Sequence, residues 1–153
     1  GGTEEYASGG ATFGTLVHAL LAQVSFDATP AQLAALSAAE ATVLGLSAVD
    51  ADIAARKVTR VLGHDLIRRA AGASARGACR RETAVTMTLP DGTLMEGVVD
   101  LAFEEDGRWT VVDYKTDREL SGNEDAYRRQ VAAYTAAVAA AVGAPASGIL
   151  VRT

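Results

Sequence analysis

The chain carries an aspartate inside each of two valine-rich runs, Asp100 in "EGVVDLAFEE" and Asp113 in "RWTVVDYKTD". Both runs are rich in β-forming residues, and the turn sequence "DGR" separates them, so we expect two neighbouring strands of one sheet. A buried carboxylate without a partner is costly, so two of them require a cation or a hydrogen-bond network. The fold is constrained accordingly, because the sheet has to bring both aspartates to a place where such a partner exists.

Lys115 follows Asp113 at a spacing of two, and strand side chains alternate faces with that period, so both point the same way. Asp100 lies in the neighbouring strand and can meet Asp113 across the ladder. Two close carboxylates repel unless a divalent cation neutralises them, and hard oxygen ligands suit Mg²⁺ or Mn²⁺. A lysine at the same site can orient or deprotonate a water, or stabilise negative charge on a reacting phosphate.

The composition excludes several classes of protein. With 153 residues and 49% hydrophobic residues, the chain fits one domain with a sizeable core and is not a disordered segment. Its longest apolar run, which starts at Val131, is well short of the ~20 residues of a membrane-spanning helix. The single cysteine, Cys79, excludes an internal disulfide, a four-cysteine zinc site and a four-cysteine iron–sulfur cluster. We expect a cytoplasmic protein. We also expect a fragment of a longer polypeptide, because no initiator methionine is present.

The charge is unevenly distributed. A net charge of −5 argues against a general polyanion binder. Between Ile53 and Arg81, however, the sequence contains eight basic residues and a single acidic one, Asp65. The members of this basic run are Arg56, Lys57, Arg60, Arg68, Arg69, Arg76, Arg80 and Arg81. Such a run is usually a solvated helix face, and a groove for a nucleic-acid backbone is the alternative.

The periodicity predicts an α/β domain after a flexible segment over residues 1–11. Helices are expected at residues 11–24, 30–45, 47–62 and 64–72, with N-caps at Thr29 and Ser47 and a stop at Gly45. Strands are expected at residues 80–89, 93–105 and 109–115, and, after a helix over 123–143, at residues 148–153. His64 has no matching partners and is interpreted as a packing or capping histidine. The order predicts a mixed central sheet, made of a three-stranded meander, a helix and a last strand.

Further motifs surround the two aspartates. "GTLVH" places Gly14 four residues before His18, "RRETAV" places Glu82 ahead of the strand pair, and "QVAAY" places Gln130 four residues before Tyr134. Together with "GVVD" and "VVDYKTD", these motifs resemble the PD-(D/E)xK nuclease superfamily. The chain is most similar there to the RecB/AddA-type nuclease domain at the C-terminus of bacterial helicase–nucleases. The resemblance covers residues 12–153 and implies one nuclease domain with a restriction-endonuclease-like core flanked by N-terminal helices.

The resemblance implies a role for each matched residue. His18, Asp100 and Asp113 look like metal ligands, joined by the backbone carbonyl of Tyr114. Lys115 looks like the catalytic lysine. The implied cofactor is Mg²⁺ or Mn²⁺.

The remaining matches look like supporting residues. Gln130 and Tyr134 are one helical turn apart and share a face, so they look like a pair that supports the site or the DNA strand near it. Glu82 resembles an early acidic residue of the family. Thr116 and Asp117 complete the signature and are expected to hold the loop.

The implied function is Mg²⁺-dependent hydrolysis of DNA phosphodiesters. The family implies that the substrate is single-stranded DNA, fed by a helicase motor in the same polypeptide during double-strand-break repair and recombination. A second AddB/RecC-like subunit is implied as a further partner. No membrane association is expected. One alternative is a free-standing exonuclease of the same superfamily. Others are a catalytically inactive DNA-binding scaffold and a metal-dependent enzyme acting on another phosphoester.

Overall fold

The computed structural model describes residues 10–153, which divide into two compact units. We call them the helical unit and the sheet unit and describe each by itself. The helical unit contains residues 10–68, 116–119 and 153, and the sheet unit contains residues 69–115 and 120–152. Most of the predicted flexible segment lies outside the described residues, and the first described helix begins at Gly10.

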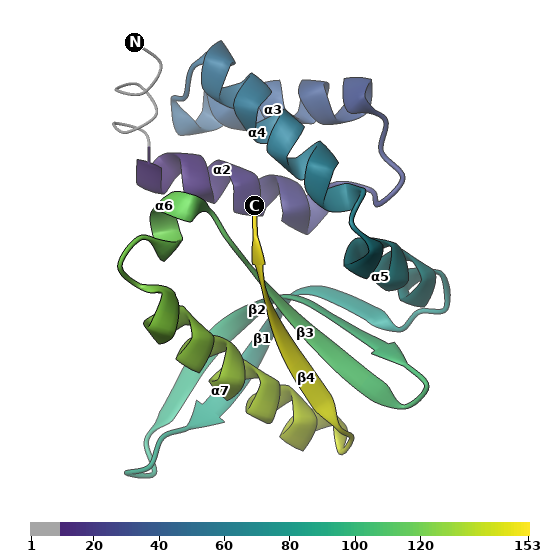
Figure 1. Cartoon of the computed structure of the whole chain (residues 1–153), viewed down its shortest axis with the longest axis vertical. Helices are drawn as coiled ribbons and strands as arrows, with labels where there is room; N and C mark the ends of the chain where they lie inside the picture. Colours follow the sequence, from purple (N-terminus) through teal and green to yellow (C-terminus); the bar gives the residue numbers. More distant parts are fainter. Residues whose placement is uncertain (1–9) are drawn as a thin grey trace. The chain divides into compact units, whose positions relative to one another are not determined.

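The main described helices of the helical unit are α2 (Gly10–Gln23), α3 (Pro30–Leu44) and α4 (Ala48–Leu62) (Figure 1). The apolar stripe of α2 is buried among them, since Leu16 and Val17 are fully inaccessible to solvent. Burial of such a stripe, rather than helix propensity, supplies most of the stability of helices of this length.

The predicted helix boundaries at the N-termini of α3 and α4 are confirmed. Thr29 and Gln32 form a capping box, in which each side chain accepts the backbone N–H of the other residue. Ser47 and Asp50 do the same at the start of α4. Gly45 ends α3 in the left-handed conformation, with φ of 72°. These caps satisfy N–H and C=O groups that a helix end leaves without partners.

The helix α5 (Asp65–Ala75) is longer than predicted. Its expected end at Gly72 is wrong, because that glycine keeps a negative φ and the helix continues through it. The left-handed conformation that ends a helix occurs instead at Gly77, with φ of 74°. His64 caps α5 as expected: its Nδ1 accepts the backbone N–H of Leu66 at 3.1 Å.

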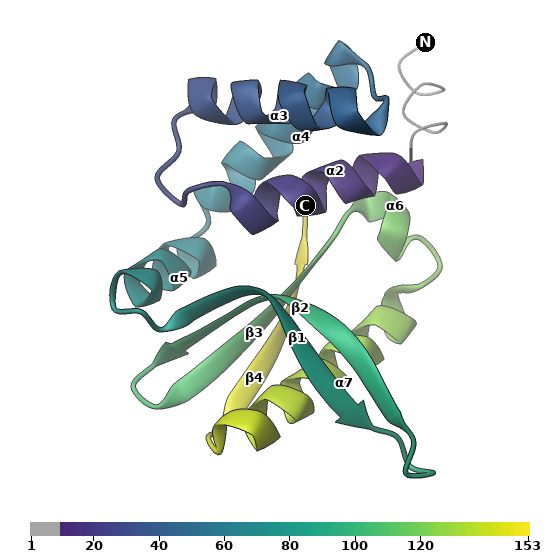
Figure 2. The ribbon, with the colours of Figure 1, turned by 180° about the vertical axis from the view of Figure 1, so that it is seen from behind.

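The described strands form one sheet in the order β1-β2-β3-β4. Strands β1 (Cys79–Thr88), β2 (Leu94–Glu105) and β3 (Arg108–Lys115) form an antiparallel meander, and β4 (Ala146–Arg152) pairs with β3 in parallel. The helix α7 (Glu124–Val142) connects β3 to β4 and packs against the sheet (Figures 1 and 2). The predicted mixed α/β fold, consistent with a restriction-endonuclease-like core, is confirmed.

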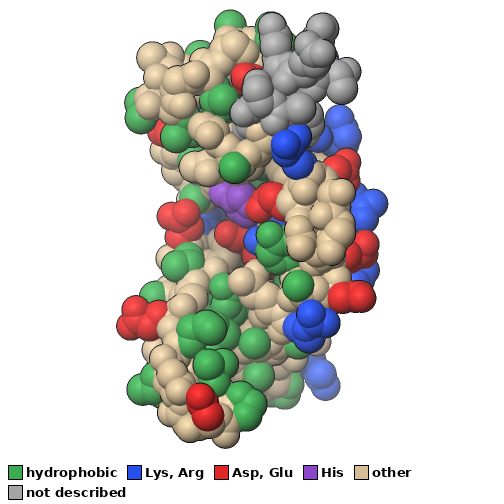
Figure 3. Space-filling model, turned by 90° about the vertical axis from the view of Figure 1, so that its left-hand side faces the viewer, with side chains coloured by type: hydrophobic (Ala, Val, Ile, Leu, Met, Phe, Trp, Pro, Cys, Tyr) green, Lys and Arg blue, Asp and Glu red, His purple; other side chains and the backbone are tan. Residues whose placement is uncertain are grey.

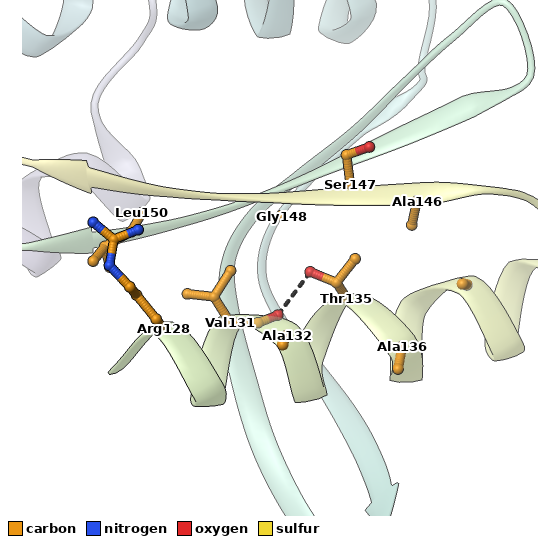
Figure 4. Close-up of a pocket in the computed structure, with 10 residues that line it drawn as sticks. Arg128, Val131, Ala132, Thr135, Ala136, Ala146, Ser147, Gly148 and Leu150 are labelled. Atoms are coloured by element: carbon orange, nitrogen blue, oxygen red, sulfur yellow. Dashed lines mark hydrogen bonds between the residues drawn. The ribbon is translucent and has the colours of Figure 1, made fainter. Parts of the chain in front are cut away.

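Small residues let α7 lie close to the sheet. A cluster of buried residues from β1, β2, β3 and α7 fills the space between them. It consists of Val85, Val99, Ala102, Val111, Tyr134 and Val138. At the β4 side, Gly148 passes Val131 and Thr135 so closely that a Cβ would lie 2.3 Å from Thr135 Oγ1. Figure 4 shows this crossing, which lies in a groove of about 450 Å³.

Gly97 of β2 makes the same kind of contact with Tyr134, whose Cε1 would lie 2.6 Å from an added Cβ. We expect Gly97→Ala to displace the ring and to destabilise the protein by about 1–3 kcal/mol, as overpacked cores do. Thermal unfolding followed by circular dichroism measures this loss. Gly72→Ala, in the middle of α5 with Arg76 Nη1 3.9 Å away, is the matched control and should stabilise. Equal melting temperatures for Gly97→Ala and the wild type would contradict the close packing.

The outer end of the β1–β2 hairpin is apolar. Large hydrophobic side chains are exposed there at Leu94, Met95 and Val98, with Leu94 68% accessible. Hydrophobic side chains gather toward the lower end of the face in Figure 3. Within residues 10–153, none of the helices combines the length and apolarity needed to cross a membrane.

Candidate active site

Asp100 takes the place of a backbone acceptor where the strands diverge. The last pair of the β2–β3 ladder on this side is Leu101 with Val112. One residue further, Asp100 Oδ2 accepts the backbone N–H of Tyr114 at 2.9 Å. This hydrogen bond anchors the carboxylate next to Asp113, the residue before Tyr114.

Glu82 stands opposite Asp100 on β1, at an interruption in the pairing. The flanking pairs Arg81–Leu101 and Thr83–Val99 are formed, but Glu82 has φ of 46°, in the left-handed region that non-glycine residues rarely adopt. Its side chain is exposed. Such backbone outliers persist where the surrounding structure holds them in place, and they cluster at functional sites. The structure therefore puts the predicted acidic residue beside Asp100 in register, at a strained point of β1.

Asp113 is buried, with 3% of the residue exposed. Its Oδ2 forms no hydrogen bond with any residue in the described part of the chain. Lys115 Nζ lies 3.4 Å from that oxygen, an ionic contact longer than the usual 2.7–3.2 Å of an N–H···O hydrogen bond. Burial raises the pKa of Asp113 from 3.8 to about 7; the charge of Lys115 opposes this shift, and the charge and hydrogen bond of Asp100 add to it. A buried carboxylate oxygen without a hydrogen bond is rare and calls for an explanation.

The pair Asp100–Asp113 fits a hard divalent cation. Residues 10–153 contain no group of three or more histidine, cysteine, aspartate or glutamate side chains arranged to hold a metal ion. Mg²⁺, however, is usually bound through one or two carboxylates and completes its shell with waters and substrate phosphate. A second positive charge beside Asp113 would also offset the repulsion between the carboxylates. The unsatisfied Asp113 Oδ2 is thus a suitable ligand atom.

Lys115 is held from two sides. Its side chain is 12% exposed, and besides Asp113 it contacts Tyr127 of α7, with Nζ 4.6 Å from the ring centroid. Sequence reasoning missed Tyr127. The signal was available, because Tyr127 lies three residues before Gln130 and seven before Tyr134 and therefore on the same face of the helix.

Tyr134 and Gln130 lie on α7, in the sheet unit with the aspartates. Tyr134 is buried against β2, and Gln130 is half-buried one turn before it. Burial raises the pKa of Tyr134, and the negative charges of Asp113 and Asp100 raise it further. A phenol with a raised pKa remains a neutral hydrogen-bond donor at physiological pH. The phenolic oxygen lies beside Gly97 of β2, where an added Cβ would be 2.9 Å from it.

His18 lies in the helical unit, where its partner is an acidic residue that sequence reasoning missed. His18 Nε2 lies 3.2 Å from Glu119 Oε1, and Gly14, one turn earlier on α2, leaves room for that carboxylate: an added Cβ would lie 3.4 Å from Oε1. Asp100 and Asp113 belong to the sheet unit. That His18 and the two aspartates bind one metal ion stays a prediction.

Thr116 directly precedes a short helix, α6 (Asp117–Leu120), that was not predicted. The Glu119 N–H donates to Thr116 Oγ1 at 3.2 Å, and the Thr116 N–H donates to Glu119 Oε1 at 2.9 Å. This is a capping box, and its pattern "TDRE" was a recognisable signal in the sequence. Thr116 is 1% exposed and therefore holds the chain directly after Lys115 in place.

The basic run is distributed over α4, α5 and β1, with Arg76 directly after the end of α5. Several of its members have partners within the chain: Arg56 pairs with Asp52 at 2.6 Å, and Arg69 pairs with Glu105 at 2.6 Å. These pairs are largely exposed and are worth little energetically. They favour the interpretation as a solvated surface, and the nucleic-acid groove stays a hypothesis.

Comparison with known protein families gives a match over almost the whole chain. The family model described as the PD-(D/E)XK nuclease superfamily matches residues 2–153. A search of curated proteins found no match. The matched range includes both aspartate-bearing strands, the lysine after the second and the helix that follows. The chain therefore belongs to the PD-(D/E)XK nuclease superfamily, whose members are generally metal-dependent nucleases.

Proposed function

We propose that this domain is a Mg²⁺-dependent deoxyribonuclease that hydrolyses DNA phosphodiester bonds. One observation carries the proposal: a buried Asp113 oxygen without a hydrogen bond lies beside Asp100 and 3.4 Å from Lys115. An acidic pair of this kind without a cation would be a liability in a core. In a nuclease superfamily, such a pair would serve as a ligand set with a lysine next to it.

The residues divide the work as follows. Asp100, Asp113 and the carbonyl of Tyr114 would hold the ion, with His18 as a further proposed ligand. When bound, a divalent cation polarises the scissile phosphate and lowers the pKa of a water. Lys115 places its positive charge where negative charge develops on the phosphate, or orients the attacking water.

The neighbouring residues keep this arrangement in place. Tyr134 can donate its phenolic hydrogen toward the acidic pair or the substrate, and Gln130 can hydrogen-bond the DNA strand from the same face of α7. Glu82 is proposed as an additional acidic residue at the edge of the site. Its strained backbone, opposite Asp100, supports a role tied to that position.

We also propose that the domain works as the RecB/AddA-type nuclease of a cytoplasmic helicase–nuclease. The order of "GTLVH", "GVVD", "VVDYKTD" and "QVAAY" supports this assignment. A motor domain in the same polypeptide would then supply single-stranded DNA during double-strand-break repair and recombination, with a second AddB/RecC-like subunit as partner. The net charge of −5 fits a domain that receives its DNA from a motor rather than capturing it by charge alone.

The first test is cleavage of end-labelled single-stranded DNA by the wild-type domain. We expect products with Mg²⁺ or Mn²⁺ and none with chelator, together with a rise in melting temperature on adding metal, because a ligand that binds the folded state stabilises it. Duplex DNA and a small phosphodiester serve as comparison substrates.

Other outcomes would point elsewhere. Hydrolysis of the small phosphodiester without cleavage of DNA would replace the proposal with a different phosphoesterase. Metal-independent DNA binding without cleavage would favour an inactive scaffold. If the domain shows neither cleavage nor a metal-induced rise in melting temperature, the metal site itself is contradicted.

A further inference from the structure

We propose that Tyr127 is a positioning residue that holds the Lys115 ammonium against Asp113 through the face of its aromatic ring. This inference rests on the proposed function, because it assigns the lysine a part in DNA cleavage. It adds to the site a residue of α7 that lies outside the matched motifs.

The geometry places the ammonium between two groups of different chemistry. Lys115 Nζ lies 3.4 Å from Asp113 Oδ2 and 4.6 Å from the centre of the Tyr127 ring. A cation within about 6 Å of an aromatic centroid is attracted by the ring's quadrupole, more strongly when it is desolvated. With 12% of its side chain exposed, Lys115 is largely shielded from water. A flexible four-carbon stem is thus fixed at its charged end.

An aromatic ring suits this task better than a second carboxylate would. An ammonium has three N–H donors, and a carboxylate partner occupies one or more of them. The face of a ring attracts the charge without accepting a proton, so the donors stay available to a phosphate oxygen or a water. Tyr127 can therefore fix the position of Lys115 without using up its hydrogen-bonding capacity.

The helix makes Tyr127 a rigid support. Tyr127 lies on the face of α7 that also carries Val131 and Tyr134, both buried against the strands. Its backbone N–H donates to Asn123 O at 3.0 Å in the first turn. Two acidic side chains lie in that turn: Glu124 is paired with Arg128 at 2.7 Å, and Asp125 is exposed. The start of α7 thus offers Lys115 an aromatic face, while the Glu124 carboxylate is held by Arg128.

Kinetics of two variants test the role. Tyr127→Phe keeps the ring face and should retain kcat within about twofold, whereas Tyr127→Leu removes it. We expect Tyr127→Leu to lower kcat about 3- to 30-fold with KM unchanged, the rate equivalent of a partly desolvated cation–π contact. Tyr127→Gln repeats the test if the leucine variant unfolds. Equal kcat for Tyr127→Leu and wild type, or an equal loss for Tyr127→Phe, would overturn the proposal.

A second readout does not depend on cleavage. The chain has two lysines, Lys57 and Lys115, so selective ¹³C labelling gives two ε-methylene signals, which Lys57→Arg assigns. The ring current of Tyr127 should shift the Lys115 signal upfield in wild type and Tyr127→Phe, and the shift should vanish in Tyr127→Leu. A Lys115 signal that is the same in all three proteins would overturn the contact. If wild type cuts no DNA, the proposed function fails, while this spectrum still decides whether Tyr127 holds Lys115.

Discussion

Lys115→Ala is expected to lower kcat for DNA cleavage about 10²- to 10⁴-fold, the range for removing a positioned acid–base or charge-stabilising group. The metal-induced rise in melting temperature should persist, because Asp100 and Asp113 remain. The ammonium 3.4 Å from Asp113 Oδ2 contributes charge at the site but is not a metal ligand. Single-turnover cleavage at saturating DNA, with a thermal melt in Mg²⁺ and in chelator, measures both quantities.

The second lysine of the chain provides the matched control. Lys57 lies on α4 in the helical unit, and its Nζ contacts the Thr153 carbonyl oxygen at 3.5 Å. Lys57→Ala removes the same charge and should leave kcat within about twofold. If Lys115→Ala and Lys57→Ala behave alike, the lysine has no part in the chemistry.

Asp113→Asn should abolish cleavage and at the same time stabilise the metal-free protein at neutral and alkaline pH. The folded-state pKa of Asp113 is raised from 3.8 to about 7, mainly by burial. A raised pKa means that the folded state binds the proton on Asp113 more tightly than the unfolded state does. The stability that this proton contributes is present below pH 4 and is lost as pH rises through 7. Asparagine mimics the neutral acid and avoids that loss. By pH 8, the variant should exceed wild type by about 2–4 kcal/mol.

Urea unfolding of wild type and Asp113→Asn between pH 4 and pH 8, in chelator, measures the difference. The two free energies of unfolding should converge at low pH and separate as pH rises. Mg²⁺ should then stabilise wild type more than the variant, because a ligand atom is missing in the latter. Asp125→Asn, at an exposed position in the first turn of α7, controls for the loss of one negative charge. If the difference in free energy of unfolding between wild type and Asp113→Asn stays constant with pH, ionised Asp113 does not destabilise the fold.

The sheet and most helices could be predicted because their signals are local. Alternating β-formers with "PDG" and "DGR" turns specify the meander, and Thr29 and Ser47 mark helix starts by cap chemistry. The end of α5 was misplaced because glycine permits a left-handed conformation without requiring it, and Gly72 does not adopt it.

Partners that depend on tertiary geometry were harder to predict. The spacing of two between Asp113 and Lys115 predicted that both side chains point the same way. It did not predict that the ring of Tyr127, twelve residues after Lys115, contacts the lysine. Tyr127 shares its helix face with many core residues, so its position over Lys115 follows only from how α7 packs on the sheet. Glu119 had a visible capping pattern, but its pairing with His18 joins residues about a hundred positions apart.

The hydrogen bond from the Tyr114 N–H to Asp100 has an evolutionary consequence. Because Asp100 replaces a backbone acceptor at the end of the β2–β3 ladder, its loss would leave a buried N–H without a partner. Asp113 is under the opposite pressure, since its ionised form burdens the fold whenever metal is lacking. In a lineage released from selection for cleavage, Asp113 would be substituted first. Asp100 would be retained for longer, because the fold still needs its hydrogen bond. The two carboxylates of one site thus differ in how long they outlast its activity.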